Sequence, residues 1–395
     1  MPSPNRTHFS DLRGVTRMAI DATAGVADIV ERMHRTIQLR PGPLGQATVD
    51  TTRGITGFVY RSVRGGMRLV GHGLDASLAP LTAMLPAGES TPARDAFLSA
   101  VNGVYGDYLV RTGNPLAIDM SFRVRGRHVD PGDPSSACTA ERGAAPTGRL
   151  LLLVHGLCMN DRQWTRDGHD HGAALADEIG CTPLYLRYNS GLRVAANGRS
   201  LAGLLETVVR HWPRPVEELV IVGHSMGGLV ARSACHHGRT AGHAWPARLR
   251  KLVFLGTPHH GAPLERGGHR LDFVMDLSPY SAPFTQIGKM RSAGIQDLRH
   301  GAITTDPDEF VPLPEGVHCY AAAATLAARR SVVGERLLGD GLVPLDSALG
   351  RHTDPARTLR LPKQRQWVGF GIGHLELLSR TDVYAQLRKW LGEAN

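Results

Sequence analysis

Residues 219–232 read LVIVGHSMGGLVAR, and this stretch decides the fold class. The apolar, mostly β-branched run at 219–222 predicts a buried parallel strand. The segment G-H-S-M-G at 223–227 fits G-x-S-x-G, a pattern that holds a serine on a strained turn between a strand and a helix. Glycines suit such a turn because a Cβ would clash where backbones crowd. The pattern therefore predicts that Ser225 is a nucleophile in a hydrolase or an acyl transferase.

Strands and helices alternate from residue 150 onward. Apolar runs predict strands at 150–154, 183–188, 219–222, 249–255, 317–323 and 366–370. Helical spacing of apolar residues predicts helices at 172–179, 199–212, 229–237 and 381–391. This alternation is typical of an α/β fold with a mostly parallel central sheet covered by helices on both faces.

The N-terminal part of the chain has a different pattern. Residues 1–112 are expected to form a helical accessory region, with apolar stripes near 15–37, 54–85 and 92–110. These helices pack on the main domain or a partner subunit, or they meet lipid, and the sequence leaves that choice open. The catalytic domain is expected at 113–395, beginning with a half-buried strand at 116–124 and a polar loop or poor hairpin at 125–148. A proline-containing break at 262–315 is a candidate lid.

Composition restricts the class of protein. The chain has 395 residues, 42% of them hydrophobic, and a formal net charge of +9. No basic run is interleaved with aromatic residues, which disfavours nucleic-acid binding, although the charge fits a mild preference for anionic membrane surfaces. Five scattered cysteines indicate free thiols in a reducing compartment. Because neither a secretory signal nor a membrane-spanning run is recognisable, a soluble cytoplasmic protein is expected, with peripheral contact to a membrane or lipid body as the alternative.

A serine nucleophile needs a histidine base and a carboxylate that orients it, and α/β hydrolases carry them in the chain order Ser, acid, His. Asp340 in GDGLVP (339–344) and His374 in GIGHLELL (371–378) follow Ser225 in that order, each in a glycine-flanked loop. Functional groups of open α/β sheets lie in loops beyond strand ends. The rivals are Asp346 for the acid, and His318 and His352 for the base.

The oxyanion formed during acyl transfer needs backbone N–H donors. The residue after the nucleophile, Met226, supplies the first candidate donor. The expected strand at 150–154 runs into His155-Gly156-Leu157, which makes the Leu157 amide the second candidate. Cys158 is expected to be a packed thiol, since nothing local would lower its pKa.

With these pieces in view, the chain resembles α/β-hydrolase lipases, namely bacterial triacylglycerol lipases and the GPI inositol-deacylase-like group. The matching segments are LLLVHGL (151–157), VIVGHSMGGLVAR (220–232), LVFLGTPHHGAP (252–263), GDGLVP (339–344) and GIGHLELL (371–378). The resemblance implies an eight-stranded type of core and carboxylic ester hydrolysis. By position it assigns Ser225, Asp340 and His374 to the triad, and Leu157 and Met226 to the oxyanion hole. Residues 1–115 carry no recognisable motif.

No cofactor and no metal are expected. Some of these lipases hold a structural calcium, but no matching acidic pair is found here, and the histidines at 169, 171, 259 and 260 fit solvated or structural loops better than a metal site. The expected function is a serine carboxylic-ester hydrolase that cleaves acyl esters of lipid-like character through a Ser-His-Asp triad and an acyl-enzyme. The alternatives are an acyltransferase with the same triad, and a lipid- or granule-associated binding protein acting through the N-terminal helices. The substrate's acyl and alcohol portions and the oligomeric state are left open.

Overall fold

The computed structural model describes residues 11, 13–18, 91–124, 126–134, 146–262, 292–328 and 339–392. The chain divides into two compact units, Met1–Ser90 with Arg111–Leu116, and Thr91–Val110 with Ala117–Asn395. In the first unit residues 13–18 are helical, and the Asn114 side chain donates a hydrogen bond to the Gly14 carbonyl (3.1 Å). The rest of the predicted helices near 15–37 and 54–85 lies outside the described residues.

The second unit is built on an eight-stranded sheet. Its strand order is β10-β9-β8-β7-β3-β6-β1-β2. The strands are β1 (Ser121–Val124), β2 (Arg127–Val129), β3 (Arg149–Val154), β6 (Thr182–Arg187), β7 (Glu218–His224), β8 (Leu249–Leu255), β9 (His318–Thr325) and β10 (Gln366–Phe370). The six strands from β10 to β6 are parallel, and the β1–β2 hairpin pairs antiparallel with β6. The predicted mostly parallel sheet is confirmed.

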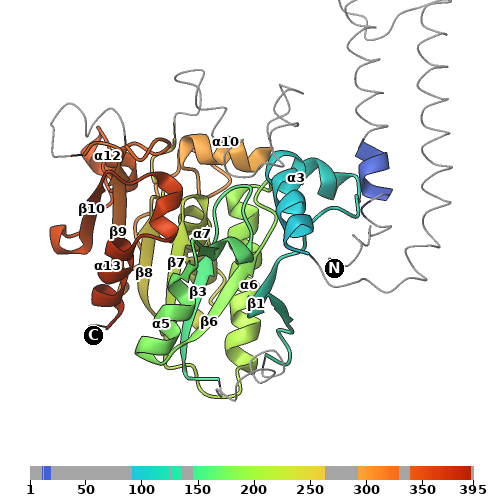
Figure 1. Ribbon diagram of the computed structural model, residues 1–395, viewed down its shortest axis with the longest axis horizontal. Helices are drawn as coiled ribbons and strands as arrows, with labels where there is room; N and C mark the ends of the chain where they lie inside the picture. Colours follow the sequence, from blue (N-terminus) through green and yellow to red (C-terminus); the bar gives the residue numbers. More distant parts are fainter. Residues whose placement is uncertain are drawn as a thin grey trace, which may run out of the picture. The chain divides into compact units, whose positions relative to one another are not determined.

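Helices cover both faces of this sheet (Figure 1). The longer ones are α3 (Pro92–Arg111), α5 (His171–Ile179), α6 (Val194–His211), α7 (Met226–Thr240), α10 (Ala293–His300) and α13 (Thr381–Gly392). A four-residue helix, α12 (Leu345–Ala348), and short 3₁₀ turns, η1 (Asp161–Trp164), η2 (Trp245–Arg248), η3 (Pro355–Arg357), η4 (Lys363–Arg365) and η5 (His374–Leu378), lie in the connections, with a small ribbon of β4 (Thr165–Arg166) and β5 (His169–Asp170). No helix of the described ranges is long and apolar enough to cross a membrane.

Two predicted boundaries were wrong. The alternating pattern at 116–124 forms a strand only from Ser121 onward, because only residues 121–123 have backbone partners on β6. The helix predicted at 199–212 begins earlier, at Val194. Its first turn receives the Asp297 carboxylate, which accepts a hydrogen bond from the Val194 N–H (2.9 Å). That partner is about a hundred residues away in the sequence, so no local capping signal was present to mark the start.

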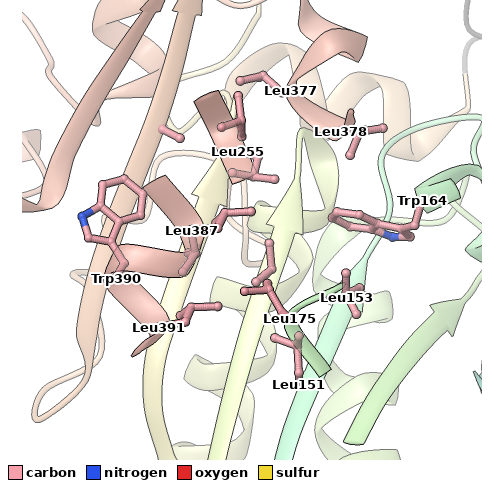
Figure 2. Packing of buried hydrophobic residues seen from close by; sticks show 14 of the residues in the cluster. Leu151, Leu153, Trp164, Leu175, Leu255, Leu377, Leu378, Leu387, Trp390 and Leu391 are labelled. Carbon is pink, nitrogen blue, oxygen red and sulfur yellow. The ribbon is translucent and has the colours of Figure 1, made fainter. Parts of the chain in front are cut away.

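Alternating side chains of the central strands build two cores. One set, from β3, β7, β8 and β9, packs with Leu175 of α5 and with Leu387, Trp390 and Leu391 of α13 (Figure 2). The other set faces α6 and α7, because successive side chains of a strand point to opposite faces. Leu152, Ile221 and Phe254 belong to this second set and are fully buried. Burial on both faces is what the continuous apolar runs predicted.

Successive strands of the parallel sheet are added on opposite sides of β3. From β3 the chain passes through α5 to β6 on one side, then returns through α6 to β7 on the other side of β3. The loops after β3 and β7 therefore diverge, and in open α/β sheets ligands bind at such a switch point beyond the carboxyl ends of the strands. Val154, the last residue of β3, pairs with Gly223 near the end of β7, so both strands end at the same level.

The helix α3 lies in the second unit, whereas the predicted accessory region ran to residue 112. Its buried Asp95 accepts hydrogen bonds from Arg187 on β6 (2.6 Å) and from Arg162 on η1 (2.8 Å). Asp161 and Arg123 interact electrostatically with the same charges. These contacts tie α3 to the sheet. Most of the predicted lid at 262–315 lies outside the described residues, and its described part contains α10.

Candidate active site

Ser225 occupies the turn between β7, which ends at His224, and α7, which begins at Met226. Its backbone has φ 53° and ψ −125°, a conformation that is costly for any residue with a Cβ and that persists only where the surroundings impose it. The Ser225 N–H donates to the carbonyl of Leu255 at the end of β8 (2.8 Å). Strain of this kind is a property of the serine turn that the G-x-S-x-G pattern predicts.

The glycines around Ser225 are required by close backbone approach. A Cβ on Gly227 would overlap the Val154 carbonyl oxygen at the end of β3. A Cβ on Gly223 would lie 2.6 Å from the Cα of Gly228. Both positions therefore admit only glycine, because real Cβ atoms do not come so near to backbone atoms. Without side chains at these two positions, the backbones of β7, the serine turn and α7 can approach one another and the end of β3 closely.

Asp340 and His374 meet beside this turn. The Nδ1 of His374 lies 2.7 Å from Oδ2 of Asp340, and both side chains are buried. The other carboxylate oxygen, Oδ1, accepts from the N–H groups of Leu342 (3.0 Å) and Val343 (2.8 Å). A backbone bond from the His374 N–H to the Asp340 carbonyl (3.1 Å) joins the two loops as well. The carboxylate is thus held in one orientation, with one oxygen left for the histidine.

His224 links this pair to the serine turn. Its Nε2 donates to the backbone carbonyl of His374 (3.1 Å), and the two imidazole rings pack with centroids 4.7 Å apart. Burial, followed by the proximity of His374, holds the pKa of His224 well below its usual value. His224 is therefore neutral at neutral pH and places no positive charge beside His374. On the other side, a Cβ on Gly256 would lie 3.1 Å from both Asp340 Oδ2 and His374 Cε1.

The segment after β3 runs alongside the serine. A Cβ on Gly156 would lie only 3.1 Å from the Cβ of Ser225, so the two turns touch. The next residue is Leu157, the predicted second oxyanion donor, which is buried. Met226, the predicted first donor, stands at the first position of α7, where an N–H has no acceptor within the helix.

The rival residues lie elsewhere. Asp346 is half exposed and its carboxylate faces Arg351 (3.5 Å). His352 packs against His260, with ring centroids 4.9 Å apart. His318 begins β9, at the opposite end of that strand from Thr325, whose carbonyl accepts from Ile372 in the loop leading to His374. The structure thus brings the elbow of Ser225 together with Asp340 and His374, and it brings none of the rivals there.

Comparison with known proteins finds a family model that matches the central part of the chain. Residues 145–312 match the family model described as the PGAP1-like alpha/beta domain. That range contains the serine turn and four of the eight strands of the sheet, β3, β6, β7 and β8, with the connections between them. The matched range is less than half of the chain, and it is this range with its serine turn that the chain shares with that family model. The sheet and helices of the chain form an α/β-hydrolase fold, as the sequence predicted.

Several solved structures are similar to this chain. The mature form of the lipase BlEst2 from Bacillus licheniformis is 18% identical, with 69% of this chain and 97% of that chain covered and a TM-score of 0.43. The metagenomic carboxyl esterase MGS0156 is 18% identical, with 76% and 88% covered and a TM-score of 0.36. An esterase from Pyrobaculum calidifontis is 14% identical, with 62% and 75% covered and a TM-score of 0.40. No curated protein matches the chain.

The histidine pairs that the sequence raised as metal candidates have structural partners. His169 Nε2 lies 2.8 Å from His171 Nδ1, and His171 Nε2 donates to the carbonyl of Leu377 in η5 (3.1 Å). His260 Nε2 donates to the Gly350 carbonyl (3.1 Å). His259 is buried, and its Nδ1 lies 3.4 Å from the Arg232 guanidinium. In the described part of the chain, no group of three or more His, Cys, Asp or Glu residues could hold a metal ion.

The four described cysteines, Cys158, Cys181, Cys235 and Cys319, are free and buried. Burial raises the pKa of the Cys158 thiol to about 12, so at neutral pH it is neither a thiolate nor a nucleophile. The prediction of a packed thiol at this position agrees with these facts. Cys138 lies outside the described residues.

His224 and Gly256 were not singled out from the sequence, although both contact the acid and base loops. Each lies inside a quoted motif, His224 in GHSMG and Gly256 in GTPHHG. Both residues therefore stood in motifs that the sequence analysis used. The contact between His224 and His374, however, spans about 150 residues of sequence. Spacing alone does not reveal such a contact.

Buried neutral histidines should make the stability of this protein depend on pH. Burial lowers the pKa of His155 to about 3 and that of His171 to about 4. Between pH 6.5 and 4 the unfolded chain binds these protons and the folded chain does not, so the free energy of unfolding falls as pH falls. At pH 5 each of these histidines should lower the free energy of unfolding by about 2 kcal/mol relative to its value at neutral pH.

Urea unfolding at pH 7.5 and pH 5 measures this loss. His171→Gln is the matched variant, since its amide can still donate to the Leu377 carbonyl but cannot be protonated. The variant should lose about 2 kcal/mol less than the parent between the two pH values. Equal losses in the parent and the variant would contradict the assignment of His171 as a buried neutral group.

Proposed function

We propose that this α/β-hydrolase cleaves carboxylic esters through Ser225, with acyl esters of lipid-like character as its substrates. The observation that carries the proposal is the buried Asp340–His374 hydrogen bond (2.7 Å) next to the strained serine turn. A lipase- and esterase-like fold supports ester hydrolysis in general. The nucleophile, the base and the acid are our assignments.

In the proposed reaction the His374 Nε2 takes the proton of the Ser225 hydroxyl as the oxygen attacks the ester carbonyl. Asp340 accepts from His374 Nδ1–H and stabilises the imidazolium that forms. The amides of Met226 and Leu157 donate to the oxyanion of the tetrahedral intermediate. His374 then protonates the leaving alcohol. In the second half of the reaction His374 takes a proton from water, which attacks the acyl-enzyme, and then returns the proton to the Ser225 oxygen as the acid product leaves.

A half-exposed leucine supports the apolar character of the substrate. Leu326 follows β9 and is 51% exposed. One of its methyl groups would lie 3.4 Å from a Cβ on Gly341, next to Asp340, and the other 3.8 Å from a Cβ on Gly373, next to His374. An apolar side chain therefore borders both loops that carry the acid and the base. A leaving alcohol protonated by His374 would pass this side chain, which favours apolar alcohol groups.

Labelling with a fluorophosphonate tests the assignment of the nucleophile. The probe should form one covalent adduct, on the peptide that contains Ser225, and hydrolysis of p-nitrophenyl butyrate should be lost in step with labelling. Ser225→Ala should give no adduct. An adduct on another residue, or undiminished hydrolysis after complete labelling, would refute the proposal. Product analysis with added alcohol acceptors then separates hydrolysis from acyl transfer by the same acyl-enzyme.

A further inference from the structure

Cys158, directly after the proposed oxyanion donor Leu157, has a backbone conformation that its side chain disfavours. Its φ is 57°, in the left-handed region where glycine is the usual residue. The residue is fully buried. A strained non-glycine residue that persists in a folded protein is held there by its surroundings, and such residues concentrate at functional sites. The contacts of Cys158 show which elements hold it.

The first element is the loop after β6. The Cys158 N–H donates to the Ser190 hydroxyl oxygen (3.0 Å), and Ser190 is itself buried. Asn189 secures this loop, because its Nδ2 donates to the Gly106 carbonyl of α3 (3.1 Å) and its Oδ1 accepts from Gly191 N–H (3.1 Å). The loop after β6 thus holds the chain just past Leu157 by one buried hydroxyl.

The second element is α3. The Cys158 thiol contacts the Ala100 carbonyl (3.9 Å), and a Cβ on Gly103 would overlap the Cys158 sulfur and lie 3.0 Å from its Cα. A Cβ on Gly106 would overlap the Asn189 side chain. Glycine at these two positions lets α3 lie directly on the loops after β3 and β6. The start of α10 closes the group, since the Ser292 hydroxyl donates to the Gly103 carbonyl (2.7 Å), and Figure 1 shows α3 and α10 side by side.

We infer that Ser190 and the Gly103 surface of α3 are positioning elements for the oxyanion hole. They hold Cys158 in its left-handed conformation, and this conformation directs the preceding amide of Leu157 toward the substrate. The inference rests on the proposed ester hydrolysis and adds residues that do not touch the substrate. A donor displaced by a fraction of an ångström stabilises the developing oxyanion less while leaving substrate binding unchanged, so the effect belongs in kcat.

The test compares Ser190→Ala with Ser233→Ala. Both serines are buried and both hydroxyls bond to backbone groups, but Ser233 bonds to the Ile303 carbonyl (2.6 Å) rather than to the loop after β3. The substrates are p-nitrophenyl acetate and the matching thionoester, whose C=S sulfur is a poor acceptor for oxyanion-hole donors. Melting temperatures report general destabilisation.

Ser190→Ala should lower kcat for the oxygen ester about 10-fold with KM unchanged. It should affect the thionoester less, so that the preference for the oxygen ester falls. Ser233→Ala should leave that preference unchanged. An equal loss on both substrates, or an unchanged kcat in Ser190→Ala, would overturn the inference. Should the parent enzyme hydrolyse neither ester, or should Ser225→Ala remain active, the proposed function fails instead.

A second pair of variants approaches the same loop from α3. Gly103→Ala places a methyl group against the Cys158 sulfur and should lower the preference for the oxygen ester in the same way. Adding Cys158→Gly removes the sulfur and supplies a residue at ease with a φ of 57°. The double variant should recover most of the preference that Gly103→Ala loses, because the two changes act on one contact. Additive losses in the double variant would contradict a positioning role for this contact.

Discussion

Replacing Ser225 with alanine should lower kcat for p-nitrophenyl esters by about 10⁴-fold or more. The variant loses the hydroxyl that we assign as the nucleophile. Cys158, the nearest thiol along the oxyanion segment, has a pKa raised to about 12 by burial. The residual rate would come from the oxyanion donors acting on bound ester and water.

The fold should survive this change. Ser225 makes its recorded backbone bonds through N–H and C=O, to Leu255 and Gly228, and alanine keeps both. Melting temperatures of the variant and the parent should therefore agree, as measured by circular dichroism. Ser233→Ala, a buried serine of α7, serves as the control and should retain activity. Retained ester hydrolysis in Ser225→Ala would remove the serine from the mechanism.

Asp340→Asn should lower kcat about 10³- to 10⁴-fold with little change in structure. The carboxylate oxygen Oδ1 already accepts from Leu342 and Val343, so the asparagine carbonyl will occupy that position. The amide NH₂ then faces His374 Nδ1, which becomes an acceptor. His374 is left with its proton on Nε2, the nitrogen that must accept the proton of Ser225.

Steady-state kinetics across pH 6 to 9 checks this result, because a tautomer defect lowers kcat throughout. Asp346→Asn is the matched control. Asp346 is six residues further along and is the acid that the sequence offered as a rival, but it is half exposed and pairs with Arg351. It should lose less than twofold, since an exposed ion pair contributes at most about 1 kcal/mol to stability and nothing to the site. A reversed ranking of the two variants would exchange their roles.

The parallel sheet could be predicted because its strands are apolar on both faces. Residues 249–255 and 366–370 have the predicted bounds, since their apolar runs end where the pairing ends. The first residue of β1 was harder to predict. Leu116 and Ile118 continue the alternation of β1 toward its N-terminus, but the Ile118 N–H bonds to the Asn102 side chain (2.9 Å) and not to a strand. A tertiary partner overrode the local period there.

The candidate triad followed from chain order and glycine context, both of which are local signals. Asp340 and Asp346 could be separated only by weighing the residues around them, and the distinction in space comes from the backbone bond between His374 and Asp340. The oxyanion segment was found, but its support was not. Ser190 and Gly103 lie in no recognisable motif. Their roles depend on the loop after β3, which packs against them only in the folded protein.

The charges under α3 decide where this chain can be divided. A fragment that begins at residue 113 would keep every quoted motif but would lose Asp95. Arg187, Arg162 and Arg123 would then surround Asp161 alone, and Arg187 is buried. Removing one partner of a buried ion pair costs about 3–5 kcal/mol, a large share of the stability of a whole domain. Domain-swap or truncation designs should therefore cut ahead of Thr91, so that the helix travels with the sheet whose charge it balances.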